Sequence, residues 1–153
     1  METKEDLKNV GLVIVGSENG HFGERGNADY VSGKSAVQIG LVRSLMGEVV
    51  RVWPGPGELS AMYEYCNADP SRVNTVAPGP VDTAQFRKEC AENPSQFWLD
   101  AEAATGLKGQ FHQKVLQSTL FLVSENWSGS ITGHVLNVDS GKQGKVMWME
   151  EEC

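Results

Sequence analysis

The residues of this chain best suited to chemistry are a tyrosine and a lysine four positions apart, Tyr30 and Lys34, in the stretch ADYVSGKSAV (28–37). Residues i and i+4 of a helix lie on one face, about 6 Å apart. A nearby ammonium favours the ionised form of a phenol. The pair can therefore act as a general acid and base toward an oxygen that develops alkoxide character. Taken alone, the two residues also fit an amphipathic helix whose lysine extends its ammonium into solvent.

Two elements must position this pair, a strand and the helix that follows it. The apolar run GLVIVGS (11–17) has the form of a strand buried on both faces, and it ends at Ser17. The Ser17 hydroxyl can hydrogen-bond the same substrate oxygen as the tyrosine. Residues 18–29 are rich in glycine and polar residues and predict a loop. From Asp29 to Val49 apolar residues recur three or four apart, which predicts a helix.

The rest of the chain continues the alternation of strand and helix. VNTVA (73–77) and GHVLNVDSG (133–141) predict two more strands, and FHQKVLQSTLFLVSE (111–125) predicts an amphipathic helix. Residues 83–109 predict short helices, and the stretch 52–72, with two Pro-Gly steps, predicts irregular structure. A βαβαβ alternation implies an α/β fold with a parallel sheet. Ligands of such sheets bind beyond the carboxyl ends of the strands, where Ser17 and the loop PGPVDT fall.

Composition limits the classes of function. The 153 residues suffice for one domain, and 13 Lys and Arg against 20 Asp and Glu give a net charge of −7, which argues against nucleic acid as a partner. Neither a membrane span nor a signal peptide is predicted, because no apolar run approaches about 20 residues and the first ten are too charged. Three widely spaced cysteines and three scattered histidines predict no disulfide and no metal site. We expect a cytoplasmic protein.

Several motifs together resemble the signature of the short-chain dehydrogenase/reductase family. That signature combines a serine, a YxxxK pair and an N-x-x-x-P-G stretch on the next strand, and it corresponds here to Ser17, the pair Tyr30 and Lys34, and RVNTVAPGPVDT (72–83). GSITGHVLNVDSG (129–141) is similar to the family's last strand and the approach to it. The resemblance runs from about Val10 to Trp148. It implies a partial Rossmann-like, doubly wound parallel sheet, a βαβαβ half-unit with a helical substrate lid.

The resemblance also implies a role for each matching residue. Tyr30 would give a proton to a carbonyl or take one from an alcohol, and Ser17 would orient the substrate oxygen. Lys34 would assist Tyr30 and hold the nicotinamide ribose. The backbone of Val81 and the side chain of Thr83 would bind the carboxamide and phosphates, so Tyr30, Lys34, Val81 and Thr83 are the expected cofactor-binding residues. The expected cofactor is NADP, with NAD as the alternative.

The resemblance is incomplete at its start. The family's glycine-rich dinucleotide loop should precede residue 10, so we expect 1–153 to be a single truncated domain, with an irregular insertion at 52–72 and the lid at 84–109. Gly16, Gly20 and Gly23 form a G-x-x-x-G-x-x-G pattern that is close to a dinucleotide fingerprint. A YxxxK helix follows them, however, instead of the helix and acid-ended strand of that motif.

Two functions follow as hypotheses. The first is an NAD(P)-dependent oxidoreductase that reduces a carbonyl or oxidises an alcohol of a small metabolite, with a homo-oligomer allowed by the family's usual contacts. Its lid residues Phe86, Phe97, Trp98 and Leu99 would line an apolar pocket or simply belong to the core. The second is a catalytically silent fragment or an oligomerisation partner of a full-length relative. No motif in the sequence supports a metal-binding or nucleic-acid-binding module.

Overall fold

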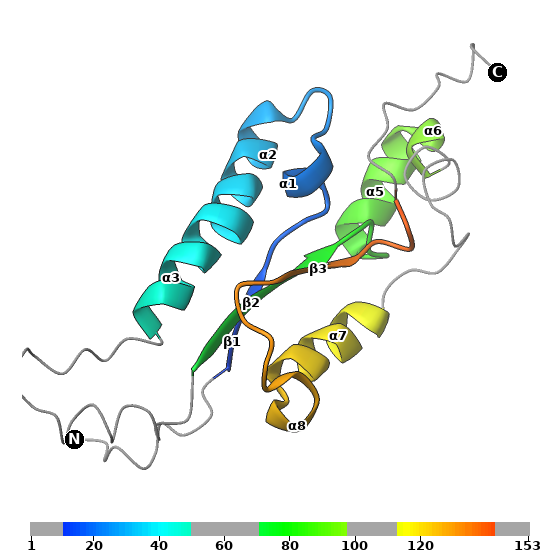
Figure 1. Ribbon diagram of the computed structural model, residues 1–153. Helices are drawn as coiled ribbons and strands as arrows, with labels where there is room; N and C mark the ends of the chain where they lie inside the picture. The colour runs from blue at the N-terminus through cyan, green and yellow to red at the C-terminus, as the bar shows by residue number, and fades with distance from the viewer. Residues whose placement is uncertain (1–10, 50–70, 98–112, 143–153) are drawn as a thin grey trace, which may run out of the picture.

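The chain folds around a parallel sheet. A computed structural model describes residues 11–49, 71–97 and 113–142 (Figure 1). In these ranges β1 (Gly11–Val15), β2 (Arg72–Pro78) and β3 (Val135–Val138) form one sheet in the order β1-β2-β3. Both pairings are parallel, which confirms the α/β fold class and the three predicted strands. The first and third strands are shorter than predicted, because residues 16–17, 133–134 and 139–141 lie outside them. The prediction that the first strand is buried on both faces is wrong: Leu12 and Val15 are 44% and 56% exposed, because β1 lies at the edge of the described sheet.

The register brings the carboxyl ends of the three strands to one edge of the sheet. β1 pairs with β2 from Gly11 opposite Arg72 to Val15 opposite Val76, and β3 pairs with β2 up to Val138 opposite Pro78. Backbone hydrogen bonds continue beyond the end of β1. The Gly16 amide donates to the Val76 carbonyl at 2.8 Å, and the Glu18 amide donates to the Pro78 carbonyl at 3.0 Å. The residues that follow β1 are therefore tied to the end of β2.

One face of the sheet is covered by the helical run that carries the Tyr–Lys pair. α2 (Ala28–Ser35), a π-helical segment η2 (Ala36–Leu41) and α3 (Val42–Val49) follow one another without a break (Figure 1). This run confirms the helix predicted at 29–49. A single-turn helix, α1 (Asn19–Phe22), lies inside the segment predicted to be a loop. Val42 is completely buried, so this part of the run packs against the core.

The opposite face is covered by α7 (Gln113–Val123) and α8 (Glu125–Ser128), which confirms the predicted amphipathic helix over its described residues. The buried Arg72 side chain holds these helices to the sheet. Its guanidinium donates to the carbonyls of Leu122, Val123 and Ser128 at 2.9 to 3.0 Å, and to the Ser128 hydroxyl at 2.7 Å. Because the last carbonyls of a helix have no backbone partner within that helix, this arginine satisfies acceptors that the helices themselves leave open. Helices thus cover both faces, as a doubly wound sheet requires.

The core is centred on the middle strand. Val73, Val76 and Ala77 of β2 are completely buried, and Val42 and Leu122 meet them from the two helical layers. Successive residues of a strand point to opposite faces. The burial of nearly every residue of β2, including the polar residues Arg72, Asn74 and Thr75, therefore reflects cover on both sides.

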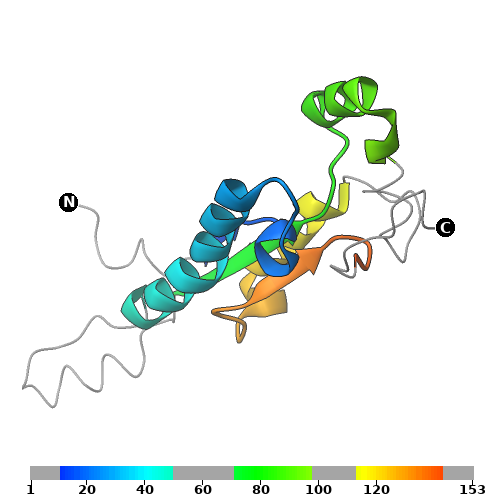
Figure 2. The same cartoon turned by 90° about the horizontal axis from the view of Figure 1, so that it is seen from above.

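α5 (Ala84–Glu92) and α6 (Pro94–Phe97) lie beyond the carboxyl ends of the strands, apart from the two helical layers (Figure 2). They confirm short helices in the first part of the segment 84–109, whose remainder lies outside the described residues. The predicted insertion at 52–72 also falls outside them, apart from its last two positions. Arg72, the last residue of that stretch, is the first residue of β2.

Candidate active site

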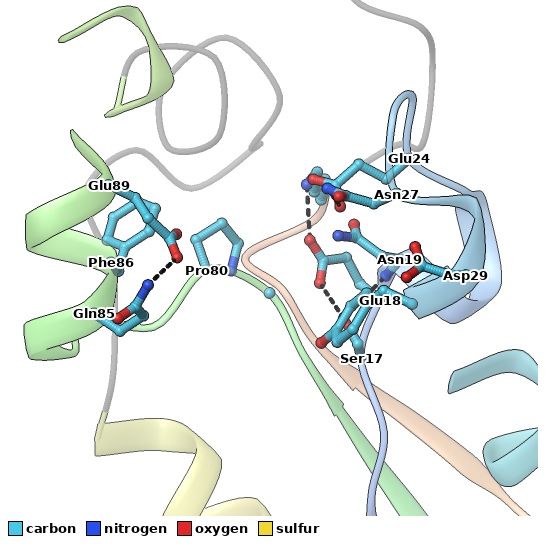
Figure 3. Close-up of a pocket in the computed structure, with 13 residues that line it drawn as sticks. Ser17, Glu18, Asn19, Glu24, Asn27, Asp29, Pro80, Gln85, Phe86 and Glu89 are labelled. Atoms are coloured by element: carbon cyan, nitrogen blue, oxygen red, sulfur yellow. Dashed lines mark hydrogen bonds and ion pairs between the residues drawn. The ribbon is translucent and has the colours of Figure 1, made fainter. Parts of the chain in front are cut away.

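A cavity of about 540 Å³ opens at the carboxyl edge of the sheet. Segments that follow all three strands contribute to it, together with α2 and α5 (Figure 3). Its lining residues are Ser17, Glu18, Asn19, Glu24, Asn27, Asp29, Tyr30, Gly79, Pro80, Gln85, Phe86, Glu89 and Lys142. The position agrees with the general rule that ligands of open parallel sheets bind outside the carboxyl ends of the strands.

Ser17 lies at the base of this cavity and is almost fully buried. Its backbone amide donates to Gln38 Oε1 at 3.0 Å. Its hydroxyl donates to Glu18 Oε2 at 3.4 Å and accepts from the Asn19 amide at 3.3 Å. The predicted site serine is thus held through both its backbone and its side chain.

Tyr30 also lines the cavity, from the first turn of α2, and its side chain is 47% exposed. Lys34 follows one turn later. Its ammonium lies 5.7 Å from the centroid of the Tyr30 ring and donates to the Val15 carbonyl at 3.2 Å. Lys34 is not among the residues that line the cavity. The lysine therefore lies on the side of the tyrosine away from the cavity, where it links α2 to the end of β1.

Val81 and Thr83, the other predicted cofactor-binding residues, belong to the loop after β2 but do not line the cavity. The Val81 carbonyl accepts from the Thr83 amide at 2.7 Å. The Thr83 hydroxyl accepts from the Phe86 amide at 3.1 Å and so caps the N-terminus of α5. Asp82 forms an ion pair with Arg87 of the same helix, and this hydrogen-bonded carboxylate raises the pKa of the Arg87 guanidinium above its ordinary value.

Gly16 and Gly20 have a packing role. A Cβ atom on Gly16 would lie 2.4 Å from Gln38 Oε1, and one on Gly20 would lie 2.9 Å from Gln38 Cδ. The absence of side chains at both positions lets the helical run approach the end of β1 closely enough for Gln38 to bind the Ser17 amide. These contacts account for two of the three glycines in the fingerprint-like pattern.

Sequence reasoning missed the buried ion pair between Glu18 and Lys142. Glu18 Oε1 lies 2.7 Å from Lys142 Nζ, and the two side chains are 4% and 14% exposed. Glu18 directly follows Ser17, whereas Lys142 follows β3. A separation of 124 positions leaves no local pattern that could have signalled the contact.

The cavity wall is more polar than the aromatic residues of the predicted lid suggest. Phe86 is part of the wall, but Glu24, Asp29 and Glu89 contribute carboxylates to it. Of the other predicted lid residues, Phe97 ends α6, and Trp98 and Leu99 lie outside the described residues.

Among residues 11–49, 71–97 and 113–142, no three His, Cys, Asp or Glu side chains gather in a way that could hold a metal ion. In the same part of the chain, no helix is both long and apolar enough to span a bilayer.

The parallel sheet and the serine and tyrosine at its carboxyl edge define a Rossmann-like protein with a candidate acid–base site. A family model described as enoyl-(acyl carrier protein) reductase matches residues 64–143. The chain belongs to this family, a branch of the short-chain dehydrogenase/reductases. The comparison with curated proteins found no match.

Two solved structures resemble the chain. ElxO with NADP bound is 27% identical with a TM-score of 0.61, and the match covers 85% of this chain and 45% of ElxO. An NADPH-bound short-chain oxidoreductase from Pseudomonas aeruginosa PAO1, with an atypical catalytic center, is 23% identical with a TM-score of 0.63. That match covers 90% of this chain and 47% of the other, and at this identity it supports the fold alone. The chain spans about half the length of both structures.

Proposed function

We propose that this chain carries the catalytic site of an NADP-dependent short-chain oxidoreductase that reduces a carbonyl, or oxidises an alcohol, of a small metabolite. One observation carries the proposal. Ser17 and Tyr30 line a single cavity beyond the strand ends, while the Lys34 ammonium lies 5.7 Å from the Tyr30 ring centroid. The family membership and the likeness to ElxO with NADP bound support the reaction class and the cofactor.

Each of the three residues has a separate task in this mechanism. In reduction, the Tyr30 hydroxyl gives its proton to the carbonyl oxygen as negative charge develops there. Lys34 places a positive charge beside the phenol, which stabilises the phenolate that remains. Ser17 hydrogen-bonds the substrate oxygen and fixes its position. In alcohol oxidation the same phenolate takes the proton back.

The residues at the site fit a nicotinamide nucleotide. A lysine ammonium has three N–H donors. The Val15 carbonyl takes one of them, and a ribose hydroxyl can accept another. In this proposal Tyr30, Lys34, the Val81 backbone and the Thr83 side chain hold the cofactor, which supplies a hydride to the carbonyl carbon when bound. Thr83 is exposed at the start of α5, so a ligand can reach its hydroxyl despite its capping bond.

The described part of the lid segment 84–109 contributes to the same cavity. Gln85, Phe86 and Glu89 of α5 line it from the side opposite the Ser17 segment (Figure 3). We infer that α5, the described part of the predicted lid, borders the bound substrate. Because its described lining combines one aromatic ring with a carboxylate and an amide, the substrate that it contacts carries polar groups in addition to the reacting oxygen.

Calorimetric titration of the purified 153-residue chain with NADPH and NADH tests the proposal, followed by turnover with a panel of small ketones and aldehydes. We expect NADPH to bind at micromolar concentration, more tightly than NADH, and to support turnover. A folded chain that binds neither nucleotide at millimolar concentration would contradict the proposal.

A second function is favoured by a separate observation. Leu116 and Trp127, on α7 and α8, are 66% and 69% exposed, and Leu120 is also exposed between them. Such apolar exposure suits a surface that binds another protein chain. A catalytically silent fragment that serves as an oligomerisation partner would bind a full-length relative, or form a homo-oligomer, through this face. Light scattering coupled to size-exclusion chromatography, with and without Leu116→Glu, tests whether this face joins two chains.

A further inference from the structure

Every fourth residue of the helical run faces the sheet or the cavity beyond it, in the series Tyr30, Lys34, Gln38 and Val42. In an α-helix such a series drifts around the axis by about 40° per step, because 3.6 residues make one turn. The π-helical segment η2 has more residues per turn, so it opposes this drift. It thereby keeps Gln38 directed toward the end of β1.

Gln38 binds the one backbone amide in this segment that β2 does not bind. The amides of Gly16 and Glu18 donate to carbonyls of β2 at 2.8 and 3.0 Å. Neighbouring amides of a strand point to opposite sides, so the Ser17 amide points away from β2, toward the free edge of the described sheet. Its acceptor is Gln38 Oε1, at 3.0 Å. Gln38 thus holds the backbone of the candidate site serine.

This bond fixes the orientation of the Gln38 side-chain amide. A backbone N–H can only donate, so the Ser17 amide must meet Oε1 and not Nε2. Gln38 is completely buried, and within the described residues its Nε2 has no hydrogen-bond partner. Buried polar groups are almost always paired. The nitrogen therefore needs an acceptor beyond those that the described residues supply.

Thr75 of β2 presents a second such group in the same place. It is completely buried, and its Oγ1 also lacks a partner in the described part of the chain. The side chains of Gln38 and Thr75 converge on Gly16, since a Cβ atom there would lie 2.4 Å from Gln38 Oε1 and 2.9 Å from Thr75 Cγ2. Both unpaired groups therefore lie in one buried layer, between η2 and β2.

We propose that Gln38 is a positioning residue for Ser17, and that a water molecule bound inside the protein between Gln38 Nε2 and Thr75 Oγ1 holds Gln38 in this orientation. The positioning role rests on the proposed function, whereas the water site does not. A water oxygen accepts from the amide nitrogen, and the Thr75 hydroxyl can either donate to the same water or accept from it. Internal waters typically satisfy buried polar groups that have no other partner.

Thr75→Val tests the water site by the sign of its effect on stability, because valine keeps the shape and removes the hydroxyl. If the hydroxyl binds water, the unfolding equilibrium constant from urea denaturation should rise about fivefold. Removal of an unpaired hydroxyl would have the opposite sign, because an unpaired buried group only costs desolvation. Rotating-frame NOE spectra should show contacts between water and the Gln38 side-chain amide protons. Thr75→Ser should retain these contacts and Thr75→Val should lose them.

Gln38→Met tests the positioning role, because it keeps the length of the side chain and removes both polar groups. We expect kcat/KM for the ketone and aldehyde panel to fall ten- to a hundredfold through misplacement of Ser17. The Kd for NADPH should stay the same, because Lys34 and Thr83 are retained. In a Ser17→Ala background, Gln38→Met should change kcat/KM little. Thr75→Val should show the same pattern to a smaller degree, and it serves as the test if Gln38→Met does not fold.

The outcomes separate the water site, the positioning role and the proposed function. A Thr75→Val chain at least as stable as the wild type, or a Gln38 side chain without water contacts, would overturn the water site. An equal loss of kcat/KM and of NADPH affinity in Gln38→Met would contradict the positioning role, since general loosening of the helical run also displaces Lys34. A folded wild-type chain with the water contacts but without nucleotide binding or turnover would overturn the proposed function, and the positioning role with it, while the water site would stand.

Discussion

The Lys34 ammonium lies 5.7 Å from the centroid of the Tyr30 ring and is bound at 3.2 Å to the carbonyl of Val15, the last residue of β1. The lysine therefore connects the helix that carries the tyrosine to the strand that leads to Ser17. Through this contact the Tyr–Lys pair is fixed relative to the carboxyl edge of the sheet. The proposed acid–base chemistry depends on that geometry.

Replacing Tyr30 by Phe should reduce ketone reduction by a factor of about 10² to 10⁴, because the hydroxyl is the proposed proton donor. The fold should persist, because the ring is retained and is 47% exposed. Steady-state kinetics with NADPH, together with circular dichroism, checks both statements. Ser32→Ala is the matched control, since the Ser32 hydroxyl binds only its own helix, at the Ala28 carbonyl. Wild-type turnover in Tyr30→Phe would contradict the role of the phenol.

Replacing Lys34 by Gln should impair both catalysis and cofactor binding. The neutral amide can still reach the Val15 carbonyl but carries no charge beside Tyr30. We expect kcat to fall about a hundredfold and the Kd for NADPH to rise about tenfold, as measured by kinetics and calorimetry. Lys88→Gln is the matched control: Lys88 is exposed on α5, and its Nζ lies 3.8 Å from Glu92 Oε1. This change should leave kcat and the Kd for NADPH unchanged. An unaltered Kd in Lys34→Gln would argue against a contact with the cofactor.

Replacing Gly16 by Ala should destabilise the protein by about 1 to 3 kcal/mol, the usual cost of overpacking. The new methyl group would lie 2.4 Å from Gln38 Oε1 and 2.9 Å from Thr75 Cγ2. It would also displace Gln38 from the Ser17 amide, so activity should fall with stability. Gly40→Ala is the control. Gly40 is exposed and lies in a helix, and a Cβ atom there would have no neighbour within 4 Å. Alanine at this position should therefore raise the free energy of unfolding by about 0.5 to 1 kcal/mol. Urea denaturation measures both variants, and equal stability in the two would contradict the packing argument.

Replacing Lys142 by Met should destabilise the chain by about 3 kcal/mol, because removal of one partner leaves the buried Glu18 carboxylate without its ammonium. Lys88→Met removes a lysine from an exposed pair and should cost less than about 0.5 kcal/mol. Thermal and urea unfolding measure the difference. The double change Glu18→Gln with Lys142→Met removes both charges and should recover much of the lost stability. If Lys142→Met lowered the free energy of unfolding no more than Lys88→Met does, the ion pair between Glu18 and Lys142 would not stabilise the fold.

Much of the fold could be predicted because its signals are local. The stretches that became β1, β2 and β3 and the periodic helix at 29–49 were each recognisable from the residues of a short segment. The boundaries were less predictable. The glycine-rich stretch after Ser17 contains α1, because Gly20 lets the chain pack closely against α2, and no composition rule anticipates such a tertiary contact.

The relative placement of the three candidate site residues could also be predicted from the order of the elements. Tyr30 and Lys34 are one turn apart on a helix, and Ser17 ends a strand, so their neighbourhood follows from the alternation of elements. The structure gives the Thr83 hydroxyl the task of capping α5, which the sequence analysis did not predict.

By itself, the sequence determined the alternation of strands and helices, the shared helix face of Tyr30 and Lys34, and the placement of Ser17 at the carboxyl edge of a parallel sheet. The shared helix face depends on residues one turn apart, and the placement of Ser17 follows from the order of strands and helices along the chain. Only the tertiary structure decided that Lys142 reaches Glu18 across 124 positions, that Gln38 holds the Ser17 amide, and that carboxylates line the cavity. The physical reason is that such contacts form only when the packed sheet brings distant strand ends together.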